Sequence, residues 1–196
     1  MCNRRGATGF SLIEVVVFIV ILGLAFAGLL ILYQRTTTAS VDPLIRKQAL
    51  AISASLIEEI ELHAFTFCDP DDSNVYTATG PPPTGCSTVE VIGVEGGETR
   101  YGAARFDNVS DYDGYCMGPG SPACPDSTIV TASGTGVTGL ENYRTDVGVQ
   151  QISAGELGAD VPATEALLIT VTTRHVPTGL TVSLQGYRVR YAPNSP

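Results

Sequence analysis

The chain has 196 residues, 44 % of them hydrophobic, and its mean hydropathy is +0.19, which excludes a chain that is disordered over most of its length. Twenty acidic residues against eleven lysines and arginines give a net charge of −9. This balance argues against a general binder of nucleic acids or anionic membranes, because both require a positive surface. With two histidines in all, the chain has little material for a His-rich metal site or a His-dependent catalytic centre.

The composition changes near residue 65. Seventeen of the 21 glycines, eleven of the twelve prolines and fifteen of the twenty carboxylates follow that point. The apolar N-terminal third is typical of helices, whereas the acidic remainder, rich in Gly and Pro, is typical of strands joined by turns. We therefore expect an α+β protein in which a long N-terminal helix packs on an antiparallel β-sheet formed within residues 66–196.

The first element in chain order is an apolar segment that begins at Phe10, after a short basic stretch with Arg4 and Arg5. Residues 15–33 carry no charge, and a helix of that length spans about 28 Å, close to the hydrocarbon core of a bilayer. A removed secretory signal is the alternative, because residues 25–27 (Ala-Phe-Ala) have the form of a leader-peptidase site. The apolar run continues beyond that site, so residues 10–41 are predicted to form a retained membrane helix.

Glu14 is the unusual residue of this segment. A carboxylate near the end of a membrane helix is costly unless a partner neutralises it, and a signal peptide would carry no charge there. If the chain were cut between Gly9 and Phe10, a new α-amine would lie four residues before Glu14. The carboxylate of one subunit could then pair with the cationic terminus of a neighbour, which would remove an unpaired charge from a dry helical bundle.

The stretch Gly9–Glu14 (GFSLIE), with the basic residues before it and the apolar helix after it, resembles the class III leader and processing site of type IV pilins and pseudopilins. The resemblance implies that residues 1–9 are a leader, that a prepilin peptidase cuts after Gly9 and methylates Phe10, and that Glu14 supports subunit registration during assembly. It also implies two further kinds of partner, namely other major and minor pilins and an inner-membrane assembly platform. A plain transmembrane anchor is the alternative.

The orientation of the membrane segment does not follow from its flanking charges. Arg35, Arg46 and Lys47 follow the segment closely, so basic residues lie on both sides of it. From the resemblance and from the cysteines, we place the C-terminal domain in the periplasm, held at the inner membrane by one N-terminal helix, and later on an extracellular pilus.

A second, amphipathic helix is predicted over residues 42–65. We predict Asp42 as its N-cap and Pro43 as its first helical residue. Apolar residues recur at spacings of three and four on one face, namely Ile45, Ala49, Ile52, Leu56 and Ile60. We expect this stripe to pack on the sheet, because about three heptads make a weak separate coiled coil. The threonines at 36–38 and Pro43 leave open whether the two helices form one kinked helix or are separated by a break.

Beyond residue 65, short runs of β-forming residues alternate with clusters of Gly, Pro, Asn and Asp. The runs lie near residues 75–79, 88–94, 99–106, 127–132 and 147–152. The clearest predicted element is a β-hairpin at the C-terminal end, in which residues 166–176 and 180–191 flank the loop Pro177-Thr178-Gly179.

The five cysteines are Cys2, Cys68, Cys86, Cys116 and Cys124. Cleavage after Gly9 would remove Cys2, and the remaining four, in an oxidising compartment, imply two disulfides. Three connectivities are possible, and we favour Cys68–Cys86 with Cys116–Cys124 because these pairs close two short loops rich in Pro. Zinc is a weaker alternative, because the sequence has no C-x-x-C pair. The absence of a cysteine after Cys124 departs from the C-terminal disulfide common in major pilins.

A second resemblance concerns the exposed domain. Residues 105–115 (RFDNVSDYDGY) and 187–191 (YRVRY) resemble minor pilins of the mannose-sensitive haemagglutinin (MSHA) type. The resemblance implies a structural, non-enzymatic minor pilin that enters or primes a pilus involved in adhesion. A minor pseudopilin of a type II secretion system and a pilus-tip adhesin that contacts a surface or glycan are the alternatives.

Two acidic groups have oxygen ligands that suit Ca²⁺, one at residues 69–72 and one formed by Asp107, Asp111 and Asp113. Neither matches an EF-hand loop, so a solvated acidic face is the preferred interpretation, and calcium is not expected to shift the melting temperature. Residues 134–139 match the letters G-x-G-x-x-G, but no apolar helical stripe follows them, so they are interpreted as a turn. No cofactor is predicted.

Overall fold

The computed structural model describes residue 9 and residues 11–80, 83–152 and 161–196. The chain divides into two compact units, Met1–Leu44 and Ile45–Pro196. Helix α1 spans Leu12–Glu61. The second unit also contains the 3₁₀ turns η1 (Val109–Tyr112) and η2 (Ala163–Glu165) and the four strands of a single sheet.

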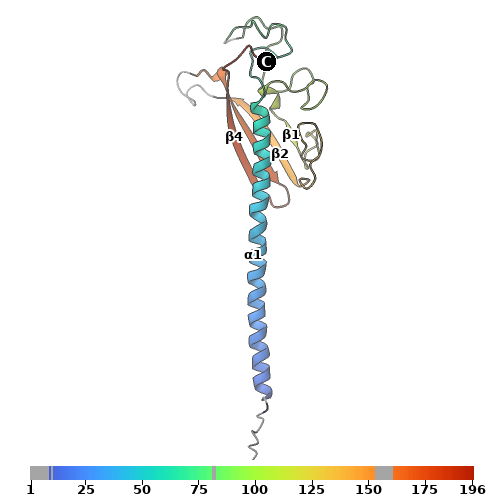
Figure 1. The fold of residues 1–196 in the computed structure, drawn as a ribbon, viewed down its shortest axis with the longest axis vertical. Coiled ribbons are helices and arrows are strands. Elements are labelled where there is room, and N and C mark those ends of the chain that lie inside the picture. The colour runs from blue at the N-terminus through green and yellow to red at the C-terminus, as the bar shows by residue number, and fades with distance from the viewer. Residues whose placement is uncertain (1–8, 10, 81–82, 153–160) are drawn as a thin grey trace, which may run out of the picture. The chain divides into compact units, whose positions relative to one another are not determined.

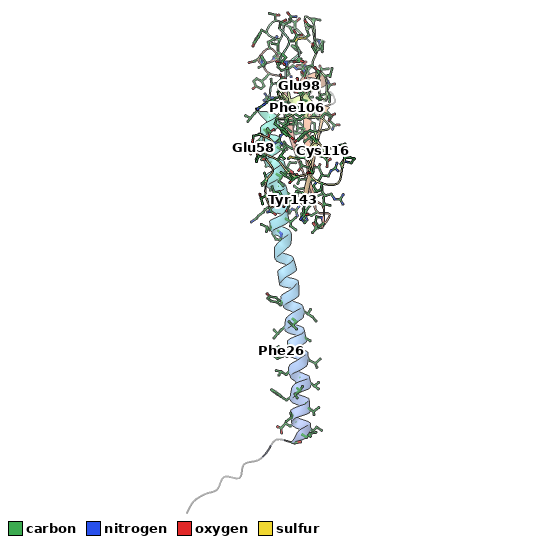
Figure 2. All side chains as sticks on the ribbon, turned by 90° about the vertical axis from the view of Figure 1, so that its right-hand side faces the viewer. Phe26, Glu58, Glu98, Phe106, Cys116 and Tyr143 are labelled. Carbon is green, nitrogen blue, oxygen red and sulfur yellow. A yellow bond between two sulfur atoms is a disulfide. The ribbon has the colours of Figure 1, made fainter. Side chains whose placement is uncertain are left out.

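In the first unit, the helical residues Leu12–Ile31 are apolar on every side except at Glu14. Residues Leu12–Ile31 have a mean hydropathy of 2.8, none of them is buried, and by length and composition they form one helix able to cross a membrane. Figure 2 shows their side chains, with Phe26 labelled, standing out around the ribbon. An α-helix that is apolar all round is stable only in apolar surroundings, supplied by lipid or by other helices.

Pro43 lies inside α1 and not at the start of a second helix, so the predicted N-cap at Asp42 is wrong, and of the two arrangements left open the structure has one continuous helix. A proline inside a helix removes one N–H donor and disfavours the helical turn before it. The residues that follow it, from Leu44 onward, are mostly good helix formers, and the helix continues to Glu61, a few residues short of the predicted end.

The predicted apolar stripe of α1 is confirmed. Its five members, Ile45, Ala49, Ile52, Leu56 and Ile60, are at most 7 % exposed. They belong to one core cluster with Val147 and Val149 of β2 and with Leu167, Ile169 and Val171 of β3. The helical turns from Ile45 onward therefore pack on one face of the sheet, which is the expected α+β architecture (Figure 1).

The sheet is antiparallel, with the strand order β1-β2-β3-β4 (Figure 1). Its strands are β1 (Cys116–Met117), β2 (Tyr143–Gln151), β3 (Ala166–His175) and β4 (Thr181–Val189). Buried and less buried residues alternate along β2 and β3, as expected when one face covers the core and the other meets solvent. The predicted C-terminal hairpin is confirmed as β3 and β4, and Gly179 supplies the positive φ, +72°, of its turn.

Four of the predicted β runs do not form strands. Residues 75–79, 88–94, 99–106 and 127–132 take part only in isolated bridges, such as Cys68↔Val89 and Val130↔Gly136. Single apolar residues of these runs are buried, for example Val75 and Ile129. Their apolar character therefore reflects burial of individual side chains under loops, whereas the run at 147–152 lies largely within β2.

Candidate functional site

The predicted processing site lies immediately before α1. Gly9 is exposed, whereas Phe10, the other half of the predicted scissile bond, lies outside the described residues. The carbonyl of Ser11 accepts hydrogen bonds from the N–H groups of Glu14 (3.0 Å) and Val15 (3.2 Å), which closes the first turn. Gly9 and Ser11 are thus outside the helix.

Glu14 stands in the first turn of α1, and its side chain is exposed. A carboxylate in the first turn of a helix is stabilised by the positive end of the helix dipole, by about 0.3–1 kcal/mol at an exposed site. Its neighbours Leu12 and Ile13 are 83 % and 71 % exposed. The first turn therefore combines one negative charge with apolar surface, which suits pairing with a cation inside an apolar bundle.

The four cysteines beyond residue 65 form two disulfides in the structure, and they are the sequential pairs favoured from the sequence. Cys68 and Cys86 have Cα atoms 5.3 Å apart, and Cys116 and Cys124 have theirs 5.0 Å apart. Cys68 is fully buried in a small cluster with Phe67, Val75 and Ala78. The Cys68–Cys86 disulfide therefore lies within a second, smaller hydrophobic core that is formed by loop residues.

A buried ion pair joins α1 to the loops, and the sequence analysis did not identify it. Arg100 Nε and Nη2 each donate a hydrogen bond to one carboxylate oxygen of Glu59 at 2.7 Å. Its third nitrogen, Nη1, donates to Tyr115 Oη at 3.2 Å and to the carbonyl oxygen of Val130 at 3.3 Å. Tyr112 Oη donates to Glu59 at 3.0 Å. The side chains of Arg100 and Glu59 are 4 % and 20 % exposed.

The two members of this pair stabilise each other's charged forms. Burial alone would raise the pKa of Glu59, but the hydrogen bond and the charge of Arg100 outweigh burial and lower the pKa. Burial alone would lower the pKa of Arg100, and the hydrogen bonds that Arg100 donates to the Glu59 carboxylate reverse that effect. This arrangement fixes a loop on a helix, and each charge is compensated by the other, so we assign the pair a structural role.

The loops bring carboxylates from three segments together. One oxygen each from Asp69, Asp71, Glu98 and Asp107 lies within 4.8 Å of the others, and these four residues are called the acidic cluster below. Burial, with the negative charge of Asp111, raises the pKa of both Glu98 and Asp107 to about 7. Carboxylate oxygens at this spacing are ligands that Ca²⁺ accepts.

The cluster combines members of both acidic groups singled out from the sequence, Asp69 and Asp71 of the first and Asp107 of the second, and adds Glu98. Asp111 accepts the N–H groups of Asp107 (3.0 Å) and Asn108 (2.7 Å), and Asp113 accepts the N–H of Val149 at 2.8 Å. The carboxylates of Asp111 and Asp113 are thus hydrogen-bonded to backbone N–H groups. Of the predicted group Asp107, Asp111 and Asp113, only Asp107 belongs to the acidic cluster. The expectation that calcium leaves the melting temperature unchanged stays a prediction.

Comparison with known proteins bears on the N-terminal segment. The family model described as the prokaryotic N-terminal methylation motif matches residues 4–30. Comparison with curated proteins and with solved structures gave no match. The motif covers Gly9, Phe10, Glu14 and most of the apolar helix, and it supports a type IV pilin or pseudopilin, a structural subunit anchored through its N-terminal helix.

Proposed function

We propose that the chain is a minor type IV pilin, a structural subunit that is processed by prepilin peptidase and incorporated into, or primes, a pilus involved in adhesion. The observation that carries the proposal is the coincidence of the methylation motif at residues 4–30 with a helix that is apolar on all sides and unburied. Such a helix needs lipid before assembly and neighbouring helices after it.

In this proposal the leader, residues 1–9, is removed after Gly9, and the new N-terminus is an N-methylated Phe10. Glu14 of one subunit pairs with the cationic Phe10 amine of its neighbour, which fixes the register of the two helices. The carboxylate loses its hydration when the helix enters a filament core, so an opposite charge is needed to offset that cost. No catalytic role is assigned to the chain itself.

The proposed partners and location follow from the same pathway. The partners are prepilin peptidase, the other major and minor pilins, and the assembly platform of the inner membrane. The β-rich domain is held in the periplasm by the N-terminal helix and then faces outward on the pilus. Two disulfides suit such a location, because they persist in oxidising compartments. The MSHA-type assignment depends on residues 105–115 and 187–191 alone.

Three experiments separate this proposal from its alternatives. Deletion of the gene should reduce pilus number; loss of protein secretion with normal piliation would instead identify a minor pseudopilin of a type II secretion system. Saturable binding of the purified protein to a surface or glycan would identify a pilus-tip adhesin. N-terminal sequencing should give methylated Phe10, whereas a start at Met1 would identify a plain anchor and a start at Gly28 a secreted domain.

The role of Glu14 is tested by Glu14→Ala. We expect the variant to be processed at Gly9 but to be lost from sheared pili, because its helix can no longer pair with the neighbouring N-terminus. Glu58→Ala is the matched control, since Glu58 is an exposed glutamate of the same helix outside the motif. Glu14→Asp should restore part of the incorporation. Normal incorporation of Glu14→Ala would refute the pairing.

A further inference from the structure

A cavity of about 390 Å³ lies among the loops that follow the first disulfide. Three aromatic residues line it, namely Tyr101, Phe106 and Tyr115, and two carboxylates, Glu98 and Asp113, lie on its walls. Figure 2 labels Glu98, Phe106 and Cys116, which all border this cavity. Its size falls in the range of small-ligand sites, which are mainly apolar and carry a few placed polar groups.

Glu98 connects the cavity to the acidic cluster. It lines the cavity, and one of its oxygens lies within 4.8 Å of carboxylate oxygens of Asp69, Asp71 and Asp107. Its Oε2 is buried and has no hydrogen-bond partner within the part of the chain that the structure describes. Because this oxygen is buried, Glu98 acts on the cavity through the negative charge of its carboxylate and not through this oxygen.

The other charges of the wall leave the cavity negative. Arg100 also lines it, but its guanidinium makes a two-bond pair with Glu59 and its charge is compensated there. Asp113 accepts the N–H of Val149, which is a neutral donor and brings no positive charge to the wall. The charges around the cavity would therefore repel an anion and attract a cation.

We propose that this cavity binds an alkylammonium cation, with its ammonium group donating to Glu98 and its apolar body against the aromatic walls. Ammonium ions are attracted both by carboxylates and by the faces of aromatic rings, and the negative charge of the acidic cluster adds to this attraction. Both a free organic amine and a lysine side chain of a protein partner carry this chemistry. The site lies within residues 94–125 and is independent of the N-terminal segment and of its proposed function.

The test is isothermal titration calorimetry of the full chain in detergent, with EDTA present and at pH 8. The probe is phenethylammonium, and 2-phenylethanol is its neutral counterpart of similar shape. We expect saturable binding of the cation and at least about tenfold weaker binding of the alcohol, because only the cation is attracted by the negative charge of Glu98 and by the aromatic faces. Nα-acetyl-lysine amide distinguishes the two sources: binding like that of the amine indicates a lysine side chain, and its failure indicates a free amine.

Three variants make the result specific. Glu98→Gln keeps the shape of the side chain and should weaken binding of the amine at least about tenfold. Glu95→Gln is the matched control, because Glu95 is a neighbouring glutamate that does not line the cavity, and it should change binding less than about twofold. Val94→Trp places a large side chain at a cavity-lining residue that is 49 % exposed, so it should abolish binding without disturbing the core.

Three results of these titrations would refute the proposal. Equal binding of the amine and the alcohol would show that charge plays no part. Equal losses in Glu98→Gln and Glu95→Gln would show a general electrostatic attraction and not a site. Unchanged binding in Val94→Trp, in a variant with the circular dichroism spectrum and melting temperature of the parent, would place the ligand elsewhere, including in the detergent.

Discussion

Replacement of Glu59 by Gln should destabilise the β-rich domain strongly. The substitution keeps the size of the side chain and its ability to accept from Tyr112, but it leaves Arg100 charged, 4 % exposed and without a counter-ion. Removal of one member of a buried ion pair costs about 3–5 kcal/mol. Because Glu59 is 20 % exposed, water can reach part of the site, and we expect the lower end, about 3 kcal/mol.

The assay is urea unfolding of the full chain in detergent, followed by circular dichroism with the disulfides intact. For an m-value of about 2 kcal/mol/M, the midpoint should fall by about 1.5 M. The corresponding fall in melting temperature is about 6–12 °C for a domain of this size. Glu58→Gln is the control, since Glu58 is the adjacent glutamate and is exposed, and it should stay within about 0.5 kcal/mol of the parent.

A second variant tests the reason for the loss. In Glu59→Leu/Arg100→Met both charges are absent, so no buried charge is left unpaired, and the double variant should be more stable than Glu59→Gln. The reasoning is refuted if Glu59→Gln unfolds at the same urea concentration as the parent. It is also refuted if the double variant is the less stable of the two, because the cost would then come from lost packing and not from an unpaired charge.

The remaining predictions concern pH and the first disulfide. Glu98 and Asp107 have pKa values of about 7 in the folded chain, above their ordinary values of 4.5 and 3.8, so the folded state binds more protons between those limits. The free energy of unfolding should therefore fall as pH rises through this window, and the melting temperature should be higher at pH 5 than at pH 8. The Glu98→Gln variant should show a weaker dependence of the melting temperature on pH. A higher melting temperature at pH 8 than at pH 5 would contradict this prediction. Replacement of Cys68 and Cys86 together by Ser should lower stability by about 3 kcal/mol in urea unfolding, because the bond closes a loop with a sequence separation of 18. A loss below about 1 kcal/mol would mean that the loop is held by its other contacts.

The features that could be predicted from the sequence are those encoded in neighbouring residues. The methylation motif around Gly9 and Glu14 is contiguous, and the stripe from Ile45 to Ile60 repeats with the period of a helix. The C-terminal hairpin has two β-forming runs and a short loop with Gly179. In each case the local pattern and the tertiary contacts favour the same structure, so the prediction needed no knowledge of distant residues.

Other features were decided only when distant segments met. Glu59 and Arg100 are 41 positions apart, and nothing local to either residue indicates the pairing. The acidic cluster takes its members from three segments, so the two groups predicted from adjacent residues, at 69–72 and at 107–113, were each only partly right. Four β-forming runs did not become strands, because a strand needs a partner with an open edge, and its formation depends on where the rest of the chain lies. The sequence by itself therefore determined the N-terminal segment and the helix-on-sheet plan, whereas the loops and their charged sites were determined by the tertiary structure.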